Sequence, residues 1–339
     1  MKKILFVGLI IVLIATTGIS QKKEKTTIAF YNVENLFDTI DNPLTWDEDF
    51  LPQGKLKWNT QRYQDKLSKL AKVLSSITPN NLPGIIGLCE VENRNVVAEL
   101  AAQNHLRKGK YRIIHKDSPG NRGIDCALLY KKRVFKPVAQ QNISISIPSN
   151  PNFKTRDILY VKGKLYKKEY LHIFVTHWPS RRGGQKKSEK NRIAVAEEIK
   201  SVTDSILKMN EDAKIIIMGD FNDEPSNKAV QEILNAKNET GNYAPAQLHN
   251  LMFATHLKKQ GSYYYRGNWN MLDNFVVSPA LLDPSKGYYT AHGAGKIFKQ
   301  SWFCYRNKKD ILVPSRTYGG PNYYGGYSDH FPIYFILTK

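Results

Sequence analysis

A carboxylate and an amide follow directly on an apolar run in the second half of the chain. In IIIMGDFN, residues 215–222, Asp220 and Asn222 come after Gly219. The run predicts a buried strand that holds its terminal side chains rigidly, and Gly219 lets another backbone or a substrate approach closely. If the chain stays extended, Asp220 and Asn222 point to the same side. The carboxylate could then accept a proton from water while the amide donates to an anion such as a phosphate. A plain polar turn is the alternative.

Five further segments place a polar residue at one end of an apolar run. They are YNVENLFD from residue 31, LCEVEN from 88, VTHWPSR from 175, MLDNFVV from 271 and YSDHFP from 327. Taken singly, each could hold a turn residue, a solvated carboxylate or a structural histidine. Together they predict one cleft into which a scaffold of strands directs its polar ends. The residues concerned are Asn32, Glu90, His177, Asp273, Asp329 and His330.

The strands and helices that would position these residues can be read from hydrophobic periodicity. No linker or internal repeat divides residues 21–339, so a single domain is expected. The alternation of strands and helices predicts an α/β fold with two β-sheets packed face to face and helices outside. Strands are expected at 26–33, 84–91, 111–114, 124–130, 158–165, 171–176, 214–218 and 331–337, and one begins at Asp273. Helices are expected at 61–77, 94–103, from a cap at Ser188 to Met209, and near 227–235.

The first twenty residues have the composition of a signal peptide. Lys2 and Lys3 precede an apolar core at 4–15, and Gly18 and Ser20 suit cleavage before Gln21. The core is shorter than the roughly 20 apolar residues of a membrane span. We therefore expect export to the periplasm or the medium, with no stable membrane insertion once residues 1–20 are removed. An uncleaved N-terminal anchor is the alternative.

The chain is strongly basic. Its formal net charge is +20, and removal of Lys2 and Lys3 leaves +18. Such an excess favours encounter with polyanions, including nucleic acid and anionic lipid headgroups. Arg181 and Arg182 could contact phosphates, and Trp178 or the tyrosines at 263–265 could stack on bases. Alternatively, the basic run is a solvated helix entry and the tyrosines pack on a loop.

Three cysteines, an odd number, leave at least one thiol unpaired within a monomer. Cys89 and Cys126 lie in apolar runs that favour core positions, and a disulfide between them stays open. None of the three, which include Cys304, has zinc-site spacing.

The order N…E…H…GDFN…D…SDH, from Asn32 to His330, resembles the endonuclease/exonuclease/phosphatase superfamily. That superfamily includes pancreatic-type DNases, abasic-site endonucleases, neutral sphingomyelinases and inositol-polyphosphate phosphatases. GDFN and SDHFP are the most specific pieces, and the resemblance covers nearly the whole mature chain. It implies a four-layer α/β sandwich of two packed mixed β-sheets flanked by helices. It also implies a metal-dependent phosphoesterase site at one edge of the paired sheets.

The resemblance assigns a metal centre. Glu90 matches the principal carboxylate ligand of a divalent ion, with Asn32 and Asp329 close to it. Oxygen donors of this kind suit Mg²⁺, which is the expected cofactor, or Mn²⁺ or Ca²⁺.

The resemblance also assigns catalytic roles. His330 matches the histidine that contacts the scissile phosphate or activates water, and Asp273 the carboxylate that orients it. His177 matches a second histidine of the DNase-like and sphingomyelinase-like branches. Asp220 matches the residue that aligns the nucleophile, and Asn222 an amide near the phosphate oxygens.

These assignments predict an exported, metal-dependent phosphodiesterase, an endonuclease with nucleic acid as substrate. A lipid or small-molecule phosphodiesterase or phosphatase would need the same catalytic set. A catalytically silent module that binds polyanions is a third hypothesis, which the intact set of polar residues argues against. A monomer is expected.

Overall fold

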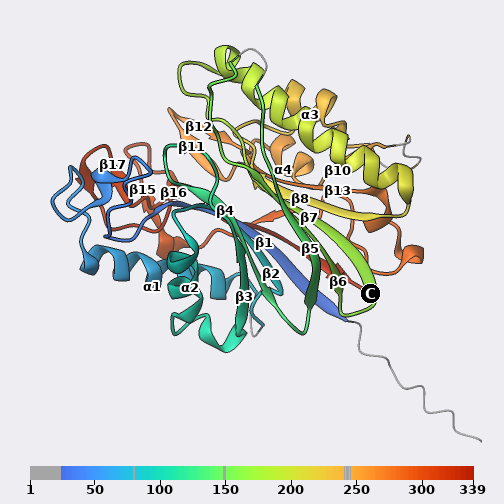
Figure 1. Cartoon of the computed structure of the whole chain (residues 1–339), viewed down its shortest axis with the longest axis horizontal. Helices are drawn as coiled ribbons and strands as arrows, with labels where there is room; N and C mark the ends of the chain where they lie inside the picture. Colours follow the sequence, from blue (N-terminus) through green and yellow to red (C-terminus); the bar gives the residue numbers. More distant parts are fainter. Residues whose placement is uncertain (1–23, 79–80, 148–149, 240, 242–243, 245) are drawn as a thin grey trace, which may run out of the picture.

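Two large mixed β-sheets form the centre of the molecule (Figure 1). The computed structural model describes residues 24–339 except 79–80, 148–149, 240, 242–243 and 245. The predicted signal peptide lies outside the described residues. The sheets have strand orders β14-β19-β1-β2-β4-β3 and β5-β6-β7-β8-β13-β10-β9. The α/β sandwich predicted from the sequence is confirmed.

The strands of each sheet come from both halves of the chain. The first sheet comprises β1 (Lys25–Leu36), β2 (Ile85–Val91), β3 (Tyr111–His115), β4 (Asp125–Lys131), β14 (Lys296–Ile297) and β19 (Ile333–Thr338). The second comprises β5 (Phe135–Ile143), β6 (Ile158–Leu165), β7 (Glu169–His177), β8 (Lys214–Asp220), β9 (Ala236–Lys237), β10 (Leu248–Asn250) and β13 (Asp273–Val277). Short hairpins are formed by β11 (Tyr263–Tyr265) with β12 (Asn268–Asn270), β15 (Cys304–Arg306) with β16 (Leu312–Pro314), and β17 (Tyr318–Gly319) with β18 (Asn322–Tyr323).

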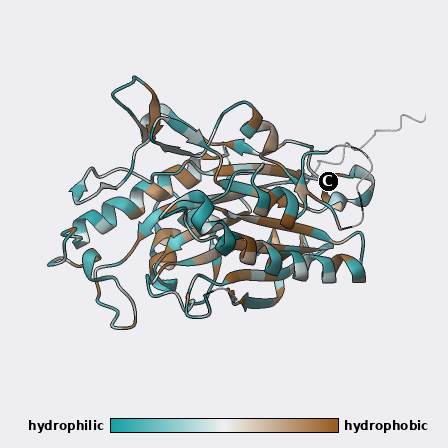
Figure 2. Ribbon diagram, turned by 90° about the horizontal axis from the view of Figure 1, so that it is seen from above, coloured by the Kyte–Doolittle hydropathy of each residue, from teal (hydrophilic) through white to brown (hydrophobic). Residues whose placement is uncertain are grey.

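Helices cover the outer faces of the sheets, which gives four layers. The longer helices are α1 (Thr60–Ser76), α2 (Arg94–Ala102) and α3 (Gln185–Met209). Shorter pieces are α4 (Phe253–Leu257), the π-helical turn η3 (Ala229–Ile233), and the 3-10 turns η1 (Glu48–Phe50), η2 (Arg107–Gly109), η4 (Pro279–Leu281), η5 (Pro284–Lys286) and η6 (Ser301–Phe303). Figure 2 shows the hydrophobic residues concentrated on the inner strands and on the inward faces of helices.

Strand alternation sorts apolar residues into three cores. Ile28 and Phe30 of β1 face the other sheet, where they join Met218 and Phe275. Their neighbours on β1 face α1 and α2, and the outer face of the second sheet packs on α3. Burial on both faces explains why β1, β2 and β8 have nearly continuous apolar sequences.

One local prediction was wrong, and one strand was not predicted. Helix α3 begins one turn before Ser188, because Gly184 with a φ of 115° starts it. The Ser188 hydroxyl instead donates to the Gly184 carbonyl and accepts from Arg192. The strand β5 was missed, because its sequence FKPVAQQNI is polar and contains Pro137, as edge strands tolerate.

Cys89 and Cys126 are register partners on β2 and β4, and both are free thiols. Among the described residues, no helix is long and apolar enough to cross a membrane.

Candidate active site

Three neighbouring strands of the second sheet bring their polar ends into one row. His177 ends β7 and is the register partner of Asp220, which ends β8. Asp220 is in turn the partner of Asp273, the first residue of β13. All three side chains are buried. The strand pairing therefore sets their spacing without any contribution from a loop.

The first sheet supplies Asn32 and Glu90 through irregular backbone. The pairing of β1 with β2 shifts register after Asn32, and that of β2 with β4 shifts at Glu90. Glu90 has a φ of 63°, and Glu34 has a φ of 51°. This left-handed conformation is costly for residues with a side chain, and β-bulges of this kind redirect side chains next to active sites. The bulges explain how Glu90 turns out of its strand toward the second sheet.

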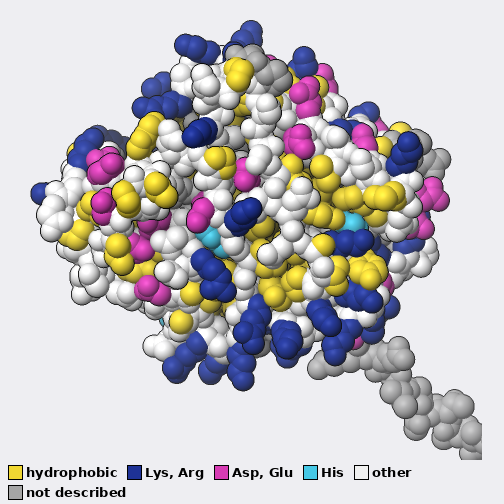
Figure 3. Space-filling view, in the orientation of Figure 1, with side chains coloured by type: hydrophobic (Ala, Val, Ile, Leu, Met, Phe, Trp, Pro, Cys, Tyr) yellow, Lys and Arg dark blue, Asp and Glu magenta, His cyan; other side chains and the backbone are white. Residues whose placement is uncertain are grey.

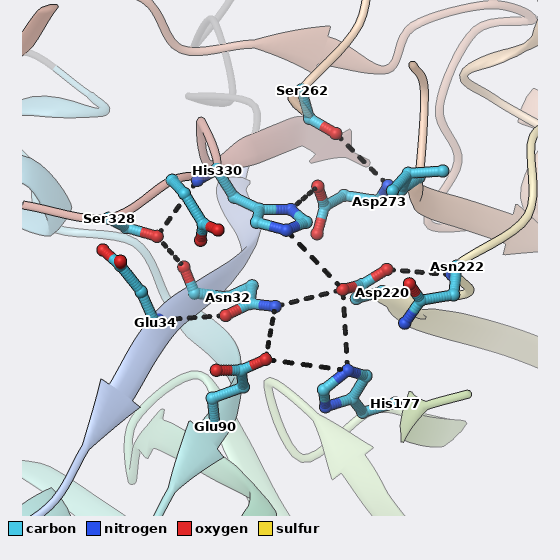
Figure 4. Close-up of polar contacts among 12 residues, drawn as sticks. Asn32, Glu34, Glu90, His177, Asp220, Asn222, Ser262, Asp273, Ser328 and His330 are labelled. Carbon is cyan, nitrogen blue, oxygen red and sulfur yellow. Dashed lines mark hydrogen bonds and ion pairs between the residues drawn. The ribbon is translucent and has the colours of Figure 1, made fainter. Parts of the chain in front are cut away.

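Asn32 connects the two sheets through its amide. The Nδ2 group donates to Asp220 Oδ2 over 3.0 Å and lies 3.4 Å from Glu90 Oε1 (Figure 4). The Oδ1 atom accepts from the backbone N–H of Glu34 over 3.0 Å. Ser328 donates from its hydroxyl to the carbonyl of Asn32. Both ends of the Asn32 amide are thus engaged, which fixes its orientation.

His330 and Asp273 form a close pair. His330 Nδ1 lies 2.7 Å from Asp273 Oδ2, and its Nε2 lies 3.7 Å from Asp220 Oδ2 (Figure 4). Burial lowers the pKa of His330, but the carboxylates of Asp273 and Asp220 outweigh burial and raise it well above its usual value. The two carboxylates therefore favour the cationic form of the ring. The ring also lies against Tyr263, with centroids 4.8 Å apart and planes tilted by 30°.

The pKa of Asp220 is raised and that of His177 is lowered, so both groups favour their neutral forms more than usual. Burial, together with the Asp273 carboxylate, raises the pKa of Asp220 to about 7 despite the charge of His330. Burial and the charges of Arg156 and Arg122 lower the pKa of His177 well below its usual value, so this imidazole is neutral. A carboxyl group that titrates near neutrality can accept a proton from water.

Glu90 fits the predicted role of a metal ligand. Burial raises the pKa of Glu90, but the charges of Arg122 and His330 outweigh it, so the carboxyl group stays ionised. Its Oε2 accepts from the backbone N–H of Asn35 over 3.0 Å, while Oε1 faces Asn32 and His177. An ionised carboxylate that lines the cleft offers the oxygen donor that a hard divalent cation prefers.

Asp329 lies at the same cleft but is oriented by a cation. Its Oδ2 atom accepts from Arg316 over 3.3 Å. One group in the site, formed by Asp220, Asp273 and His330, has its donor atoms close enough together to hold a metal ion. Within this group His330 lies 2.7 Å from Asp273, and the carboxylates that raise the pKa of His330 favour its protonated form. Asn32 lies between this group and Glu90, the predicted metal ligand, with its Nδ2 atom 3.0 Å from Asp220 and 3.4 Å from Glu90.

A cleft of about 410 Å³ brings the predicted residues from both sheets together. Glu90, His177, Asp220, Asn222, Asp329 and His330 all line it, and so do Arg181 and Arg182. Asn32 and Asp273 lie directly behind this lining and are joined to it by hydrogen bonds. The convergence of strand ends predicted from the sequence is therefore present in the structure.

Trp178 does not reach the cleft, which corrects its predicted role in substrate binding. Its side chain is wholly buried and stacks on Phe221, with ring centroids 4.4 Å apart. No base can stack on a ring that is covered on both faces by the protein. Trp178 supports the strand end that carries His177, and it is a core residue.

Asn222 and Arg181 line the cleft but are bound within the protein. Asn222 has a φ of 48°, so the chain does not stay extended after Asp220, and its side chain donates to the Trp178 carbonyl. Arg181 donates to the carbonyl of Asn222 over 2.7 Å and to Asn227 over 2.9 Å. The backbone of Thr176 fills the space beside Gly219, so the predicted close approach is made by another backbone segment.

Replacement of Trp178 by alanine should lower the free energy of unfolding by about 3–5 kcal/mol, the usual cost of removing a large buried ring. Urea denaturation measures this loss. Trp46→Ala is the matched control, because Trp46 is 69% exposed and its loss should cost less than about 0.5 kcal/mol. Equal stability of the two variants would contradict the core position of Trp178.

The sequence analysis missed two arginines and one contact of a tyrosine. Arg122 lies 3.5 Å from Glu90 and reaches it from a loop whose sequence, SPGNRGID, has no distinctive pattern. Arg156 donates to the carbonyl of Trp178 over 2.8 Å and has no signal in the sequence either. The third missed feature is the contact of Tyr263 with the His330 ring, although the tyrosines at 263–265 were noted.

Comparison with known proteins gives one family. The profile of the Endonuclease/Exonuclease/phosphatase family matches residues 27–339. A mannosyl-6-phosphatase of Bacteroides thetaiotaomicron is similar in structure, with a TM-score of 0.56. A second family protein of that organism gives a TM-score of 0.54, and each of the two is 15% identical to this chain. The match to the phosphatase covers 92% of this chain and 99% of that one. D. rerio TDP2 complexed with a single-strand DNA product gives a TM-score of 0.54 at 16% identity, over 93% and 99% of the two chains. No curated protein matches significantly in sequence.

Proposed function

Because the chain belongs to the endonuclease/exonuclease/phosphatase family and is a phosphoester hydrolase, we propose that it hydrolyses phosphodiester bonds of nucleic acid. The observation that carries the catalytic part of this proposal is the His330–Asp273 pair. His330 faces Asp220, and Glu90 lines the same cleft. This arrangement offers a fixed cation, a proton acceptor and a metal-binding carboxylate within one space.

The residues divide the work of hydrolysis. Asp220 accepts a proton from the attacking water, and Asn32 holds the carboxylate of Asp220 toward the cleft. His330, kept positive by Asp273, stabilises the negative charge on the phosphate. A divalent ion, proposed to be Mg²⁺ held by Glu90, Asn32 and Asp329, would stabilise charge on the phosphate and leaving-group oxygens.

Basic side chains support a polyanionic substrate. Arg182, Lys186 and Lys187 are exposed where α3 begins, and Arg182 lines the cleft. Figure 3 shows Lys and Arg side chains widely spread over one face of the molecule, in excess over acidic ones. The proposed place of action is outside the cytoplasm, on the basis of the signal-like sequence of residues 1–20. Cell fractionation tests the proposed export, and mass spectrometry of the N-terminal peptide tests removal of residues 1–20.

A substrate panel tests the proposed activity. The purified protein with Mg²⁺ should release acid-soluble nucleotides from DNA or RNA and should hydrolyse bis-p-nitrophenyl phosphate. Release of phosphocholine from sphingomyelin, or of inorganic phosphate from a sugar phosphate, without any action on nucleic acid would overturn the substrate class while leaving the phosphoesterase assignment intact.

Salt dependence tests the role of the basic surface. Replacement of Arg182, Lys186 and Lys187 by alanine should weaken DNA binding. It should also flatten the slope of log K against log salt by about 2, because each phosphate contact contributes roughly 0.7–0.9. The matched control replaces Lys132, Arg133 and Lys136, which are exposed at the end of the sheets opposite to His177. Equal effects of the two triple variants would show that the surface beside the cleft has no special part in binding.

A further inference from the structure

A hollow of about 440 Å³ lies between the hairpins β11–β12 and β15–β16. The strands β11 and β16 are in contact, and the two hairpins lie near one another in Figure 1. Tyr265 and Asp329 line both this hollow and the catalytic cleft, so the two spaces adjoin. We call this space the hairpin hollow and define it by Tyr264, Tyr265, Arg266, Tyr305, Lys308 and Lys309.

Several cations line the hairpin hollow, and two of them have no ion-pair partner among the described residues. Lys308 and Lys309 are exposed and make no ion pair within the described part of the chain. Lys309 extends across the hollow toward the turn at Gly267. Arg316 also lines the hollow, and it forms an ion pair with Asp329. Asp329 is the carboxylate at the boundary between the hollow and the catalytic cleft. The positive charge therefore exceeds the negative charge next to the place where a phosphate would be cleaved.

Aromatic rings accompany these cations. Tyr265 is 51% exposed and Tyr305 is 47% exposed, so part of each side chain is open to solvent. The Arg266 guanidinium lies 5.3 Å from the centroid of the Tyr265 ring. The hydroxyl of Tyr264 is buried and has no hydrogen-bond partner among the described residues. Stacking rings beside lysines and arginines are the combination by which proteins bind single-stranded nucleic acid.

We propose that the hairpin hollow is a second anion subsite, which binds a phosphate of the substrate adjacent to the one being cleaved. Lys308 and Lys309 bind that phosphate, and the attached base or sugar packs on Tyr265 or Tyr305. The inference rests on the proposed function, because it treats the catalytic cleft as the place of cleavage. If the subsite is present, the protein should prefer substrates with at least two phosphates, such as an oligonucleotide, to substrates with a single diester.

Product-like inhibitors test the subsite without requiring cleavage of nucleic acid. Hydrolysis of bis-p-nitrophenyl phosphate is measured in the presence of thymidine 5′-monophosphate or thymidine 3′,5′-bisphosphate. The bisphosphate should inhibit the wild-type protein at a concentration roughly tenfold lower, as expected for one additional charge-assisted contact. The variant in which Lys308 and Lys309 are both alanine should lose this difference and keep its turnover of bis-p-nitrophenyl phosphate.

The control removes the same charge elsewhere. Lys108 and Lys110 are exposed next to β3, at the end of the first sheet opposite to Glu90, and their replacement by alanine should leave the preference intact. Equal inhibition of the wild-type protein by both nucleotides would overturn the subsite. So would a preference that survives in the Lys308/Lys309 variant. If the preference is present but no DNA or RNA is cleaved, the subsite stands and the proposed nuclease function fails.

Discussion

Glu90→Gln is expected to reduce turnover roughly 10²–10³-fold, the usual effect of losing one group that stabilises charge in a transition state. The substitution removes the charge that the arginine at 122 neutralises, and it keeps the shape of the side chain. Because the carboxylate is assigned to the metal, the concentration of Mg²⁺ needed for half-maximal activity should rise as well. Steady-state kinetics over a metal titration measures both effects.

Glu92→Gln is the matched control for this experiment. Glu92 lies two residues further along and is also buried, but it does not line the cleft. Its carboxylate accepts from the backbone N–H of Asp38, and burial raises the pKa of Glu92 to about 8. A side chain that is largely neutral at pH 7 should tolerate the amide with little change in activity. Full activity of the Glu90 variant at limiting metal, or of the wild type in chelator, would remove the assignment.

The strands and their polar ends could be predicted because burial constrains those residues strongly. Asp220 comes at the end of one apolar run, and Asp273 comes at the start of another. A buried strand has no freedom to place its terminal side chain elsewhere. Glu90 was also identified, although its direction depends on a bulge with a φ of 63° that no propensity reveals. The order of these residues along the chain indicated the family. The family resemblance then identified the particular sandwich fold and the reaction class, which periodicity had only narrowed.

Residues beyond the strand ends could not be placed, because their environment depends on tertiary packing. Trp178 follows His177 directly, and alternation no longer applies once the strand has ended. Its burial against Phe221 depends on the turn after β8. Arg122 and Arg156 reach the site from separate loops, and neither periodicity nor local composition connects them with Glu90. The cations of the hairpin hollow likewise become neighbours only when two distant hairpins meet.

Single and double substitutions at His330 and Asp273 should give strongly non-additive losses. His330→Ala removes the cation, and Asp273→Asn removes the charge that keeps it protonated. Each change alone should lower turnover by roughly 10²–10⁴-fold, the usual contribution of a positioned proton-transfer group. Because the carboxylate acts through the imidazole, the double variant should be no slower than the slower single variant.

The comparison needs a pair of residues that do not touch. His330→Ala combined with Lys186→Ala is suitable, because Lys186 is exposed at the start of α3 and their effects should multiply. Urea denaturation of every variant separates loss of turnover from loss of folded protein, since Asp273 is buried and its backbone N–H is bonded to Ser262. If the losses from His330→Ala and Asp273→Asn multiplied as independent factors, the two side chains would act separately. The 2.7 Å contact would then be structural, and the cation at the phosphate would need another source.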